Sequence, residues 1–405
     1  MRRMIVPKAA FRVLTSVCVV LAIETVGWSQ SLTWLRTTTQ SFAHDVSNNG
    51  IVVGEIFESV YPKAFRWQNG TMQLLPGLSD RTSKALAITP DGTIVVGISQ
   101  VLSGGYYPRA ARWSGNGVEN LGTLQGGRSS EAHDVSANGS VVVGISDGRA
   151  VRWTSSGIQL ISSSTSLARA VSADGSVVVG YVMMNQQSRA FLWNLNGNIT
   201  QNLGTLGGRS HSEAWGVSPD GTVVVGLCFN NNNRQPIAFR WTQEEGMINL
   251  GTLPDHTESW ARDVAADGTV VGASSDGLQQ QRAVRWTRSG EIEDLNMVYQ
   301  DLIQGSGILL DASGISPNGR YIVGWGQRRG GPLFEAFLLD TGERPCTPHN
   351  GDVNNDGCVD DADLLAVLFA FGSTGDQLDR VDVNCDEVVD DADLLQVLFN
   401  FGSGC

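Results

Sequence analysis

The stretch LARAVSADGSVVVGYVMMNQQSRAFLWNLNGNITQNLGTLG, residues 167–207, contains the unit from which most of the chain is built. A short strand of small residues leads into a Ser/Ala/Pro-Asp/Asn-Gly turn, a Val/Ile run ending in Gly, an Ala-Phe-Arg-Trp segment and Leu-Gly-Thr-Leu. The unit occurs seven times, 36 to 51 residues apart, with turn glycines at Gly50, Gly92, Gly139, Gly175, Gly221, Gly268 and Gly319. This period is typical of four-stranded blades, so we predict a mainly β protein with a seven-bladed β-propeller.

Tight turns divide each unit into alternating strands. In residues 134–144 and 216–226, an Asn-Gly or Asp-Gly pair supplies the positive φ that a short hairpin needs. The third strand ends in a tryptophan in six copies, and Leu339 takes this place in the seventh. The tryptophans are Trp67, Trp113, Trp153, Trp193, Trp241 and Trp286. Indoles at one repeat position are predicted to fill the wedge between neighbouring blades.

The last part of each unit indicates how the ring ends. Residues 121–124, 203–206 and 250–253 read Leu-Gly-Thr-Leu, and we assign them to the fourth strand, which the seventh copy lacks. Leu32–Leu35 has a similar pattern at the same spacing before Phe42. The N-terminal strand is therefore predicted to pair into the last blade, closing the propeller and removing its open edges. Six or eight blades remain alternatives, because the third and seventh copies are degenerate.

The repeat resembles the HAF family of extracellular repeat proteins. Units of that family carry a similar Val-Ser-x-Asp-Gly, Val-Val-Val-Gly, Ala-Phe-Arg-Trp and Leu-Gly-Thr-Leu series. The resemblance covers residues 31–341. It implies a secreted protein and brings no catalytic residues to this chain.

The long loops of the propeller are expected on one face, together with the connections between blades. These uneven loops are residues 99–109, 227–236 and 324–333. Their aromatic candidates for ligand contact are Tyr106, Tyr107, Phe229 and Trp325. Aromatic rings beside Asn and Gln amides suit a carbohydrate or a peptide. The alternative is that these loops are solvated and bind no ligand. We term this side of the propeller the variable face.

The first 29 residues differ in kind from the repeats. Four basic residues precede an apolar run from Val13 to Ile23, and small residues precede a cleavage site at Gln30. We predict a secretory signal peptide at residues 1–29. The alternative, a membrane anchor, needs an apolar run of about 20 residues. The protein is expected to be extracellular or on the surface of a bacterium, with no membrane span after cleavage.

The charge of the chain is concentrated near its C-terminus. Asp and Glu outnumber Lys and Arg by 41 to 28 overall, and by 14 to 2 from Thr341 onward. Subtraction gives a net charge of −13 for the chain and −12 for this last part. The repeats are therefore close to neutral, and neither part has the basic stripe that nucleic acid requires. Nucleic acid is not an expected partner.

Two patterns resemble catalytic motifs. Residues 144–148 read Gly-Ile-Ser-Asp-Gly, the nucleophile-elbow pattern, but a strand follows where that motif needs a helix, so we interpret the match as chance. His44-Asp45, His133-Asp134 and Arg262-Asp263 occupy equivalent places in three copies. Repetition at a structural position favours hydrogen bonding between strands over catalysis. We predict that the protein is not an enzyme.

After residue 341 the sequence changes to two copies of a twelve-residue acidic loop followed by an apolar helix. Oxygen ligands at positions 1, 3, 5, 7, 9 and 12 are typical of EF-hand-like calcium loops. In the first copy these are Asp352, Asn354, Asp356, the carbonyl of Cys358, Asp360 and Asp363. In the second they are Asp382, Asn384, Asp386, the carbonyl of Val388, Asp390 and Asp393. Two calcium ions are predicted, and an acidic surface run is the alternative.

This tandem resembles a type I dockerin, at residues 342–405. The resemblance implies that two calcium loops fix two antiparallel helices, which dock on a cohesin-like or cell-surface protein. The positions that contact the partner would be Asp361-Ala362 and Asp391-Ala392. The chain departs from the family at residues 368–369 and 398–399, where Leu-Phe replaces the Lys or Arg common in dockerins. These apolar residues either pack inside the module or cover a different partner.

Four of the six cysteines lie in this module, and the expected oxidising compartment favours disulfides. Four cysteines allow three pairings. We favour Cys346 with Cys405, which clasps the ends of the module, and Cys358 with Cys385, which joins the two calcium loops. Cys18 leaves with the signal peptide, and Cys228 stands alone.

The sequence thus predicts three segments: a signal peptide (1–29), a propeller of seven repeats (30–341) and a dockerin-like module (342–405). The predicted function is a secreted, non-catalytic binding or scaffold protein anchored through the calcium-dependent module. One alternative is a carbohydrate-binding accessory of a polysaccharide-degrading complex. The other is a hydrolase that uses the propeller face. The variable loops favour binding, because they contain amides, glycines and arginines in place of convergent carboxylates.

Overall fold

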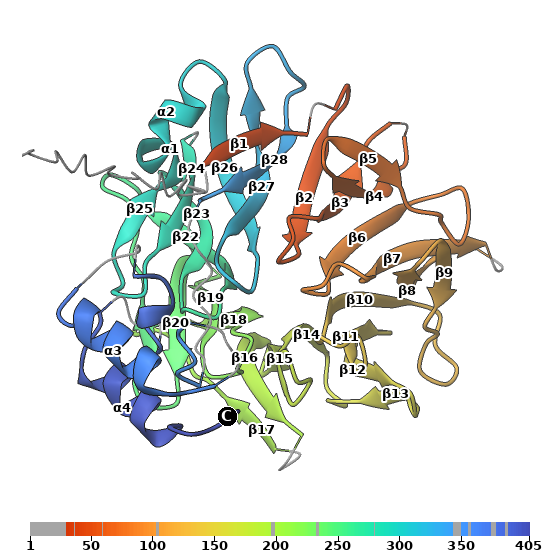
Figure 1. The fold of residues 1–405 in the computed structure, drawn as a ribbon. Coiled ribbons are helices and arrows are strands. Elements are labelled where there is room, and N and C mark those ends of the chain that lie inside the picture. The colour runs from red at the N-terminus through yellow and green to blue at the C-terminus, as the bar shows by residue number, and fades with distance from the viewer. Residues whose placement is uncertain are drawn as a thin grey trace, which may run out of the picture.

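The computed structural model describes residues 30–35, 37–58, 60–102, 105–195, 199–231, 235–278, 280–342, 350–354, 358–373, 378–384 and 388–405. Within these ranges, seven four-stranded antiparallel sheets follow one another around a common axis (Figure 1). The fold is therefore a seven-bladed β-propeller, and the alternatives of six or eight blades are excluded. The predicted signal peptide, residues 1–29, lies outside the described residues. No helix in the described ranges is both long enough and apolar enough to cross a membrane.

The first six sheets each contain four strands that are consecutive in sequence. Sheet one has β2 (Ser41–Val46), β3 (Val52–Ile56), β4 (Lys63–Gln68) and β5 (Thr71–Leu74). Sheet two has β6 (Ser83–Ile88), β7 (Ile94–Leu102), β8 (Tyr106–Ser114) and β9 (Gly117–Asn120). Sheet three has β10 (Ser130–Val135), β11 (Val142–Ser146), β12 (Arg149–Thr154) and β13 (Gly157–Leu160).

The next three sheets continue this order around the axis. Sheet four has β14 (Ser166–Val171), β15 (Val177–Met184), β16 (Gln187–Asn194) and β17 (Ile199–Asn202). Sheet five has β18 (His211–Val217), β19 (Val224–Phe229), β20 (Ile237–Thr242) and β21 (Gly246–Asn249). Sheet six has β22 (Glu258–Val264), β23 (Val270–Ser275), β24 (Gln281–Trp286) and β25 (Ile292–Asp294).

The seventh sheet combines the two ends of the repeat region. It contains β26 (Gly307–Ile315), β27 (Tyr321–Arg328), β28 (Glu335–Asp340) and, from the N-terminus, β1 (Ser31–Trp34). Strand β1 pairs antiparallel with β28, so that Ser31 lies opposite Asp340 and Trp34 opposite Phe337. The predicted pairing of the N-terminal strand with the last blade is therefore confirmed.

The turn between the first and second strands of each blade follows from its Asp/Asn-Gly pair. In blade four, Asp174 accepts hydrogen bonds from the hydroxyl of Ser172 (2.6 Å) and the N–H of Ser176 (2.9 Å). Gly175 then has a φ of 78°, and the equivalent glycines of all seven repeats have φ between 70° and 88°. Glycine adopts this left-handed conformation without a steric cost, which explains its place in every repeat.

The tryptophan of the third strand is buried between blades, as predicted. All six are at most 6% exposed. Trp153, for example, packs with Val142 and Val151 of its own blade and with Val96 and Ala110 of the preceding one. Each indole thus joins two sheets.

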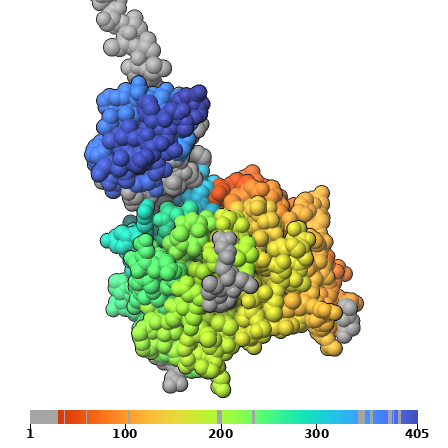
Figure 2. Space-filling model, turned by 90° about the horizontal axis from the view of Figure 1, so that it is seen from below, coloured from red at the N-terminus to blue at the C-terminus, as the bar shows by residue number. Residues whose placement is uncertain are grey.

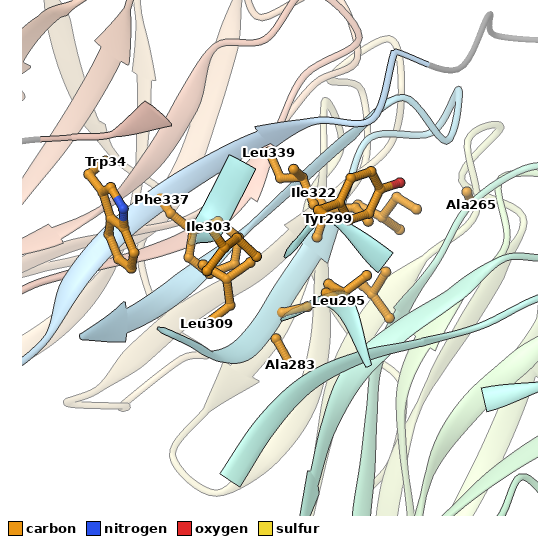
Figure 3. Packing of buried hydrophobic residues seen from close by; sticks show 13 residues of the cluster. Trp34, Ala265, Ala283, Leu295, Tyr299, Ile303, Leu309, Ile322, Phe337 and Leu339 are labelled. Atoms are coloured by element: carbon orange, nitrogen blue, oxygen red, sulfur yellow. The ribbon is translucent and has the colours of Figure 1, made fainter. Parts of the chain in front are cut away.

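In the seventh blade a helical insertion occupies the space that the tryptophan fills elsewhere. The helices α1 (Leu295–Val298) and α2 (Gln300–Ile303) lie between β25 and β26. They bring Leu295, Tyr299 and Ile303 into the cluster that contains Leu339 (Figure 3). The repeat pattern gives no sign of these helices.

The Leu-Gly-Thr-Leu segments are not fourth strands, contrary to the sequence prediction. Strand β9 ends at Asn120, and Gly122 then has a φ of 81°, which interrupts strand pairing. The N–H of Leu124 donates to the hydroxyl of Ser146 in the next blade (3.0 Å). The segment is therefore a connection that fastens one blade to the next.

The described residues from 350 onward form a small helical module, drawn in blue in Figure 2. It contains α3 (Asp361–Ala370), the short 3-10 helix η1 (Asp379–Val381) and α4 (Asp391–Phe399). Its core consists of valines in two sets 30 residues apart: Val353, Val359 and Val367, then Val383, Val389 and Val397. The matched sets show that two equivalent loop–helix units pack together.

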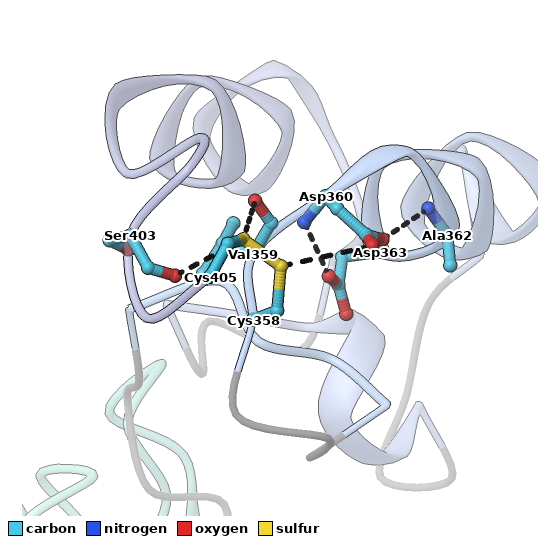
Figure 4. Close-up of a disulfide and its surroundings, with 7 residues drawn as sticks. All are labelled: Cys358, Val359, Asp360, Ala362, Asp363, Ser403 and Cys405. Carbon is cyan, nitrogen blue, oxygen red and sulfur yellow. Dashed lines mark hydrogen bonds between the residues drawn. A yellow bond between two sulfur atoms is a disulfide. The ribbon is translucent and has the colours of Figure 1, made fainter.

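A disulfide in this module joins Cys358 to Cys405, so both predicted pairings, Cys346–Cys405 and Cys358–Cys385, are wrong (Figure 4). The reason is a local backbone pairing. The N–H of Val359 donates to the carbonyl of Ser403 (3.0 Å), and the N–H of Gly402 donates to the carbonyl of Val359 (2.8 Å). This pairing brings the Cα atoms of Cys358 and Cys405 to 4.6 Å. Cys346 and Cys385 lie outside the described residues.

Candidate functional site

The aromatic residues predicted at the variable face lie in separate places. Arg81 stacks on the exposed ring of Tyr106 and donates a hydrogen bond to its hydroxyl (2.9 Å). Tyr107 is half-buried beside Gly105. Phe229 stacks on His211, with ring centroids 4.7 Å apart. These residues belong to blades two and five, and their role in binding stays a prediction.

Trp325 joins a larger aromatic cluster between blades one and seven. Its ring centroid lies 5.7 Å from that of Phe42 and 5.0 Å from that of Phe334. Phe42 also contacts Phe57, at 6.0 Å. All four rings are half-buried, so part of each remains accessible. Phe42, Phe57 and Phe334 could not be predicted as part of a site from the sequence, because they occupy repeat positions that hold other residues in most blades.

A second group of side chains projects from β-bulges in the first strand of every blade. These first strands lie innermost, around the propeller axis (Figure 1). In each of them the pairing with the second strand skips one residue at the same repeat position. A bulge of this kind re-aims a side chain and is over-represented beside functional sites. The residues skipped at this repeat position, which we term the axial ring, are His44, Leu86, His133, Arg169, Trp215, Arg262 and Ser313, and blade seven has one further shift at Leu310.

The bulge explains the glycine in each Val-Val-Val-Gly run. A Cβ atom on Gly180 would lie 2.0 Å from the carbonyl oxygen of Leu167 in the bulged first strand. Six further glycines are equally close to a first-strand carbonyl, at 1.9 to 2.0 Å: Gly54, Gly97, Gly144, Gly226, Gly272 and Gly324. No side chain fits there, because real Cβ contacts of that length do not occur. The repeated glycines therefore maintain the strand geometry that places the axial ring.

Uniform and varied positions alternate along these first strands. The residue before each bulge is an alanine in all seven blades and is fully buried: Ala43, Ala85, Ala132, Ala168, Ala214, Ala261 and Ala312. The axial ring itself contains two histidines, two arginines, a tryptophan, a leucine and a serine. Packing constrains the first position, whereas the second is free to differ. The axial ring is therefore the position at which side chains with a specific binding role can be placed without disturbing the packing.

In blades one and three, the axial-ring histidines lie beside glutamate side chains. Glu55 is 5% exposed and accepts a hydrogen bond from Lys84 (3.0 Å), and its Oε1 lies 3.4 Å from Nε2 of His44. Burial raises the pKa of Glu55, but His44 and Lys84 outweigh this effect and lower it overall. In blade three, Nε2 of His133 lies 3.5 Å from Oε2 of Glu131. Burial lowers the pKa of His133, although the neighbouring Glu131 opposes this effect.

In blades four to six, two guanidinium groups stack on one indole. The Cζ atom of Arg169 lies 5.1 Å from the ring centroid of Trp215, and that of Arg262 lies 4.6 Å from it. Arg262 also donates to Oδ2 of Asp311 (2.8 Å), a carboxylate that is 1% exposed. Arg169 forms no hydrogen bond or ion pair with any residue in the described ranges. Its positive charge is thus held close to that of Arg262, and the carboxylates of Glu213 and Glu131 favour this charge through space without forming an ion pair with it.

The Asp residues that follow the axial ring in three blades bind the backbone of the next blade. Oδ2 of Asp134 accepts the N–H of Val171 (2.7 Å), and Oδ1 accepts that of Val135 (2.7 Å). Asp45 and Asp263 make the equivalent contacts to Ile88 and Ile315. The His-Asp and Arg-Asp pairs therefore join neighbouring blades, in agreement with the structural interpretation.

Burial raises the pKa of these carboxyl groups, although hydrogen bonds from the backbone oppose it. The pKa of Asp134 is about 7 and that of Asp263 about 6, and that of Asp45 is raised well above its ordinary value. Repulsion by Asp263 adds to the effect of burial at Asp45 and Asp134. The three carboxylates thus oppose one another's ionisation.

Replacing Asp134 with Asn is expected to change how stability depends on pH. Because the pKa of Asp134 is higher in the folded protein than in the unfolded chain, the folded state binds more protons between pH 3.8 and about 7. The unfolding free energy of the wild type should fall relative to Asp134→Asn as pH rises through this window, by on the order of 2 to 4 kcal/mol. Denaturant unfolding at several pH values measures this difference.

Asp174→Asn is the matched control of opposite sign. Hydrogen bonds from Ser172 and Ser176 lower the pKa of Asp174, so its contribution is present above the unfolded pKa and is lost as pH falls. A pH-independent difference between wild type and Asp134→Asn would contradict the environment described for Asp134.

The serine of the Gly-Ile-Ser-Asp-Gly pattern has a structural role. Ser146 is fully buried, accepts the N–H of Leu124 and donates to the carbonyl of Ser129 (3.1 Å). Cys228, also fully buried, takes the equivalent place in blade five, where its Sγ accepts the N–H of Leu206 (3.4 Å). Both residues fasten the connection between blades, and the match to a nucleophile elbow is chance, as interpreted.

The calcium loops are described in part, since Asp356 and Asp386 lie outside the described residues. Asp363 is fully buried and accepts the N–H groups of Val353 (2.7 Å), Asn354 (3.0 Å) and Asp360 (2.9 Å). Asp393 makes the same three contacts in the second loop. The carboxylates at position 12 therefore close each loop at positions 2, 3 and 9. Among the described residues, no three His, Cys, Asp or Glu side chains converge on one point.

Comparison with known proteins shows the fold alone. An oligogalacturonate lyase in complex with manganese superposes with a TM-score of 0.52 at 11% identity, over 76% of this chain and 93% of that one. An oligogalacturonate lyase from Vibrio parahaemolyticus gives a TM-score of 0.51, with the same identity and coverage. TolB from Acinetobacter baumannii gives 0.42 at 13% identity, over 69% of this chain and 76% of that one. No protein-family model matches the sequence, and no curated protein matches it.

Proposed function

We propose that this protein is a secreted, non-catalytic binding protein that docks on a partner protein through its C-terminal, dockerin-like module. In this proposal the propeller presents the ligand-binding surface and calcium maintains the docking module. The observation that carries the proposal is an apolar strip that occurs twice on the module, once on each helix unit.

The two strips consist of large side chains at matched positions. They are Leu365, Leu368, Phe369 and Phe371 in the first unit, and Leu395, Leu398, Phe399 and Phe401 in the second. Phe369 is 87% exposed and Phe399 is 84% exposed. Phe369 and Phe399 therefore do not pack inside the module, and the other six side chains are 47% to 50% exposed. Exposed apolar groups of this size are typical of protein interaction sites.

The predicted partner-contacting pairs continue these strips. Asp361 and Ala362 are exposed in the first turn of α3, and Asp391 and Ala392 in that of α4. Leu365 follows Asp361 by four residues, so the two side chains are neighbours on one helix face. The exposed surface of each helix therefore has an acidic N-terminal end and an apolar remainder, and the two helices present equivalent surfaces to a partner.

The residues present fit calcium. Asp363 and Asp393 are fully buried, and no Lys or Arg in the described ranges forms an ion pair with either carboxylate. Each carboxylate accepts three backbone N–H groups, which in Asp363 lower the pKa despite burial, and a divalent cation would stabilise the negative charge further. The ion would be held by the oxygen ligands predicted for each loop, and its binding would fix the loop that positions each helix. The described chain supplies a fixed position-12 carboxylate for that purpose.

Capture experiments with the full-length chain test the docking face. We expect one protein from the secreted or envelope fractions of the source organism to bind in calcium and to be released by a chelator. Combining Phe369→Asp with Phe399→Asp should abolish this capture, because a charge on each strip opposes burial. Leu278→Asp is the control, since Leu278 is equally exposed (86%) but lies on the propeller. Capture that survives the double substitution would refute the docking face.

One observation favours the second candidate, a carbohydrate-binding accessory protein. The half-buried rings of Phe42, Trp325 and Phe334 form a cluster at the variable face of the kind on which sugars stack. This function is compatible with docking, since the two surfaces belong to different parts of the chain. Binding of neutral oligosaccharides that is lost in Trp325→Ala would support it.

A further inference from the structure

The strongest unexplained feature of the propeller is the side chain of Arg169. Its Nε atom is buried, and it has no hydrogen-bond partner in the described part of the chain. The residue as a whole is half-buried, so the guanidinium group is surrounded by protein but remains reachable. Burial lowers the pKa of Arg169, which shows that its charge is poorly solvated. A desolvated guanidinium group needs an anion or a hydrogen-bond acceptor.

The described residues around Arg169 do not supply this acceptor, so a ligand can supply it. Its plane is held against the indole of Trp215, which carries Arg262 on the same ring system. The nearby carboxylates have other contacts: Glu131 lies beside His133, and Glu213 accepts the N–H of the Trp215 indole (3.3 Å). Burial lowers the pKa of Arg169 overall and outweighs Glu213 and Glu131, which favour its charged form through space. The protein thus fixes the guanidinium group and leaves its Nε–H without a hydrogen-bond partner in the described part of the chain.

We propose that Arg169, supported by Trp215 and Arg262, binds the carboxylate of an acidic sugar at the propeller axis. A guanidinium group offers parallel N–H donors that match both oxygens of a carboxylate, and stacking on an aromatic ring orients its plane. The sugar assignment rests on the first strands of two other blades. Phe42 in β2 and Trp260 in β22 each lie two residues before the axial-ring member of their strand, toward the variable face. Both rings are half-buried and offer surfaces for a pyranose. The inference concerns the propeller and does not depend on docking by the C-terminal module.

Calorimetric titration of the full-length protein tests this site. The probes are a β-1,4-linked trisaccharide of glucuronic acid, cellotriose as its neutral counterpart, and a tri-aspartate peptide as another source of carboxylates. We expect the acidic trisaccharide to bind and cellotriose to bind at least tenfold more weakly. Arg169→Met should weaken the acidic trisaccharide by about tenfold or more, the loss expected for a charged hydrogen bond. Arg169→Lys keeps the positive charge but loses the parallel N–H donors of the guanidinium group, so it should also weaken binding. This second variant keeps the test valid if Arg169→Met does not fold.

Arg152→Met is the matched control. Arg152 also stacks on an indole, that of Trp193 at 4.8 Å, but it is located on a third strand and is hydrogen-bonded to Gln159 (2.7 Å). This variant should bind the acidic trisaccharide like the wild type. The proposal is overturned if the acidic trisaccharide does not bind, if cellotriose binds as well, or if both Arg169 variants bind normally. Binding of tri-aspartate in preference to the trisaccharide would overturn the sugar assignment. None of these results bears on calcium-dependent capture by the module.

Discussion

Gly180→Ala is expected to destabilise the propeller by about 3 kcal/mol or more, at the upper end of what overpacking costs. The added Cβ atom would lie 2.0 Å from the carbonyl oxygen of Leu167 and 3.0 Å from the Cα atom of Ala168. Both contacts are with backbone, which cannot rotate away as a side chain can. The first and second strands of blade four would have to separate, although Ala168 and Gly180 are paired there.

The consequences should extend beyond the substituted strand. Strand β15 contributes Val178 to a cluster with Phe191 and Trp193, which joins blade four to Val143 of blade three. Displacing β15 therefore loosens the contact between blades as well as the sheet. The bulge at Arg169 would also change, so binding at the axial ring should weaken together with stability.

Gly207→Ala provides the control for the loss of a glycine. A Cβ atom on Gly207 would meet no heavy atom within 4 Å, and the residue does not have a left-handed φ. Its substitution should alter the free energy of unfolding by less than about 0.5 kcal/mol. Thermal and denaturant unfolding measure the free energy of unfolding of the two variants. If Gly180→Ala and Gly207→Ala unfold alike, the close approach of the strands in every blade is not as described.

The blade architecture could be predicted from the sequence because it depends on local patterns repeated seven times. Asp174-Gly175 predicts a tight turn on its own, and six tryptophans at one position indicate one kind of packing. The N-terminal strand could be placed in the last blade for two reasons. The seventh repeat lacks its last segment, and Leu32–Leu35 has the pattern of that segment. These features need no knowledge of contacts between distant residues.

The axial ring could not be predicted in the same way. A β-bulge shifts the pairing of two strands by one residue, and nothing in the composition of Leu-Ala-Arg-Ala-Val states where that shift falls. The repeated second-strand glycine, such as Gly180, is its sequence signal, and the alanine before each bulge is another. Across the seven repeats, the uniform glycine and the uniform alanine together indicate the bulge position, where the side chains vary.

Two predictions from the sequence differ from the structure, one in the repeats and one in the C-terminal module. The place of Leu-Gly-Thr-Leu at the end of the repeat predicts a strand, but its glycine has a positive φ and the N–H of its second leucine bonds to the next blade. The cysteine positions predict one disulfide across the ends of the module and one between the two calcium loops. In the structure, Cys358 meets Cys405 because Val359 pairs with the chain that follows α4. Such a pairing depends on how two helices pack, which spacing does not encode.

Asp363→Asn is expected to abolish calcium binding in the first loop and to lower the stability of the C-terminal module by on the order of 3 to 5 kcal/mol. Both oxygens of Asp363 accept backbone N–H groups, Oδ1 from Val353 and Asn354 and Oδ2 from Asp360. An amide nitrogen in place of either oxygen would face a donor, so at least one of these hydrogen bonds is lost. The negative charge at position 12 is lost as well. The variant should bind one calcium ion where the wild type binds two.

Calorimetric titration with calcium, together with unfolding in calcium and in chelator, measures both effects in the full-length chain. The wild type should gain about 2.7 kcal/mol at a free calcium concentration 100 times the dissociation constant. Asp361→Asn is the control, because Asp361 lies two residues away, is exposed and does not close the loop. Asp393→Asn should repeat the effect in the second loop, since Asp393 makes the same three contacts. If the wild type binds no calcium, the module is held by its valine core and its disulfide. The two buried carboxylates then serve only to fix the loops, and docking would not respond to chelation.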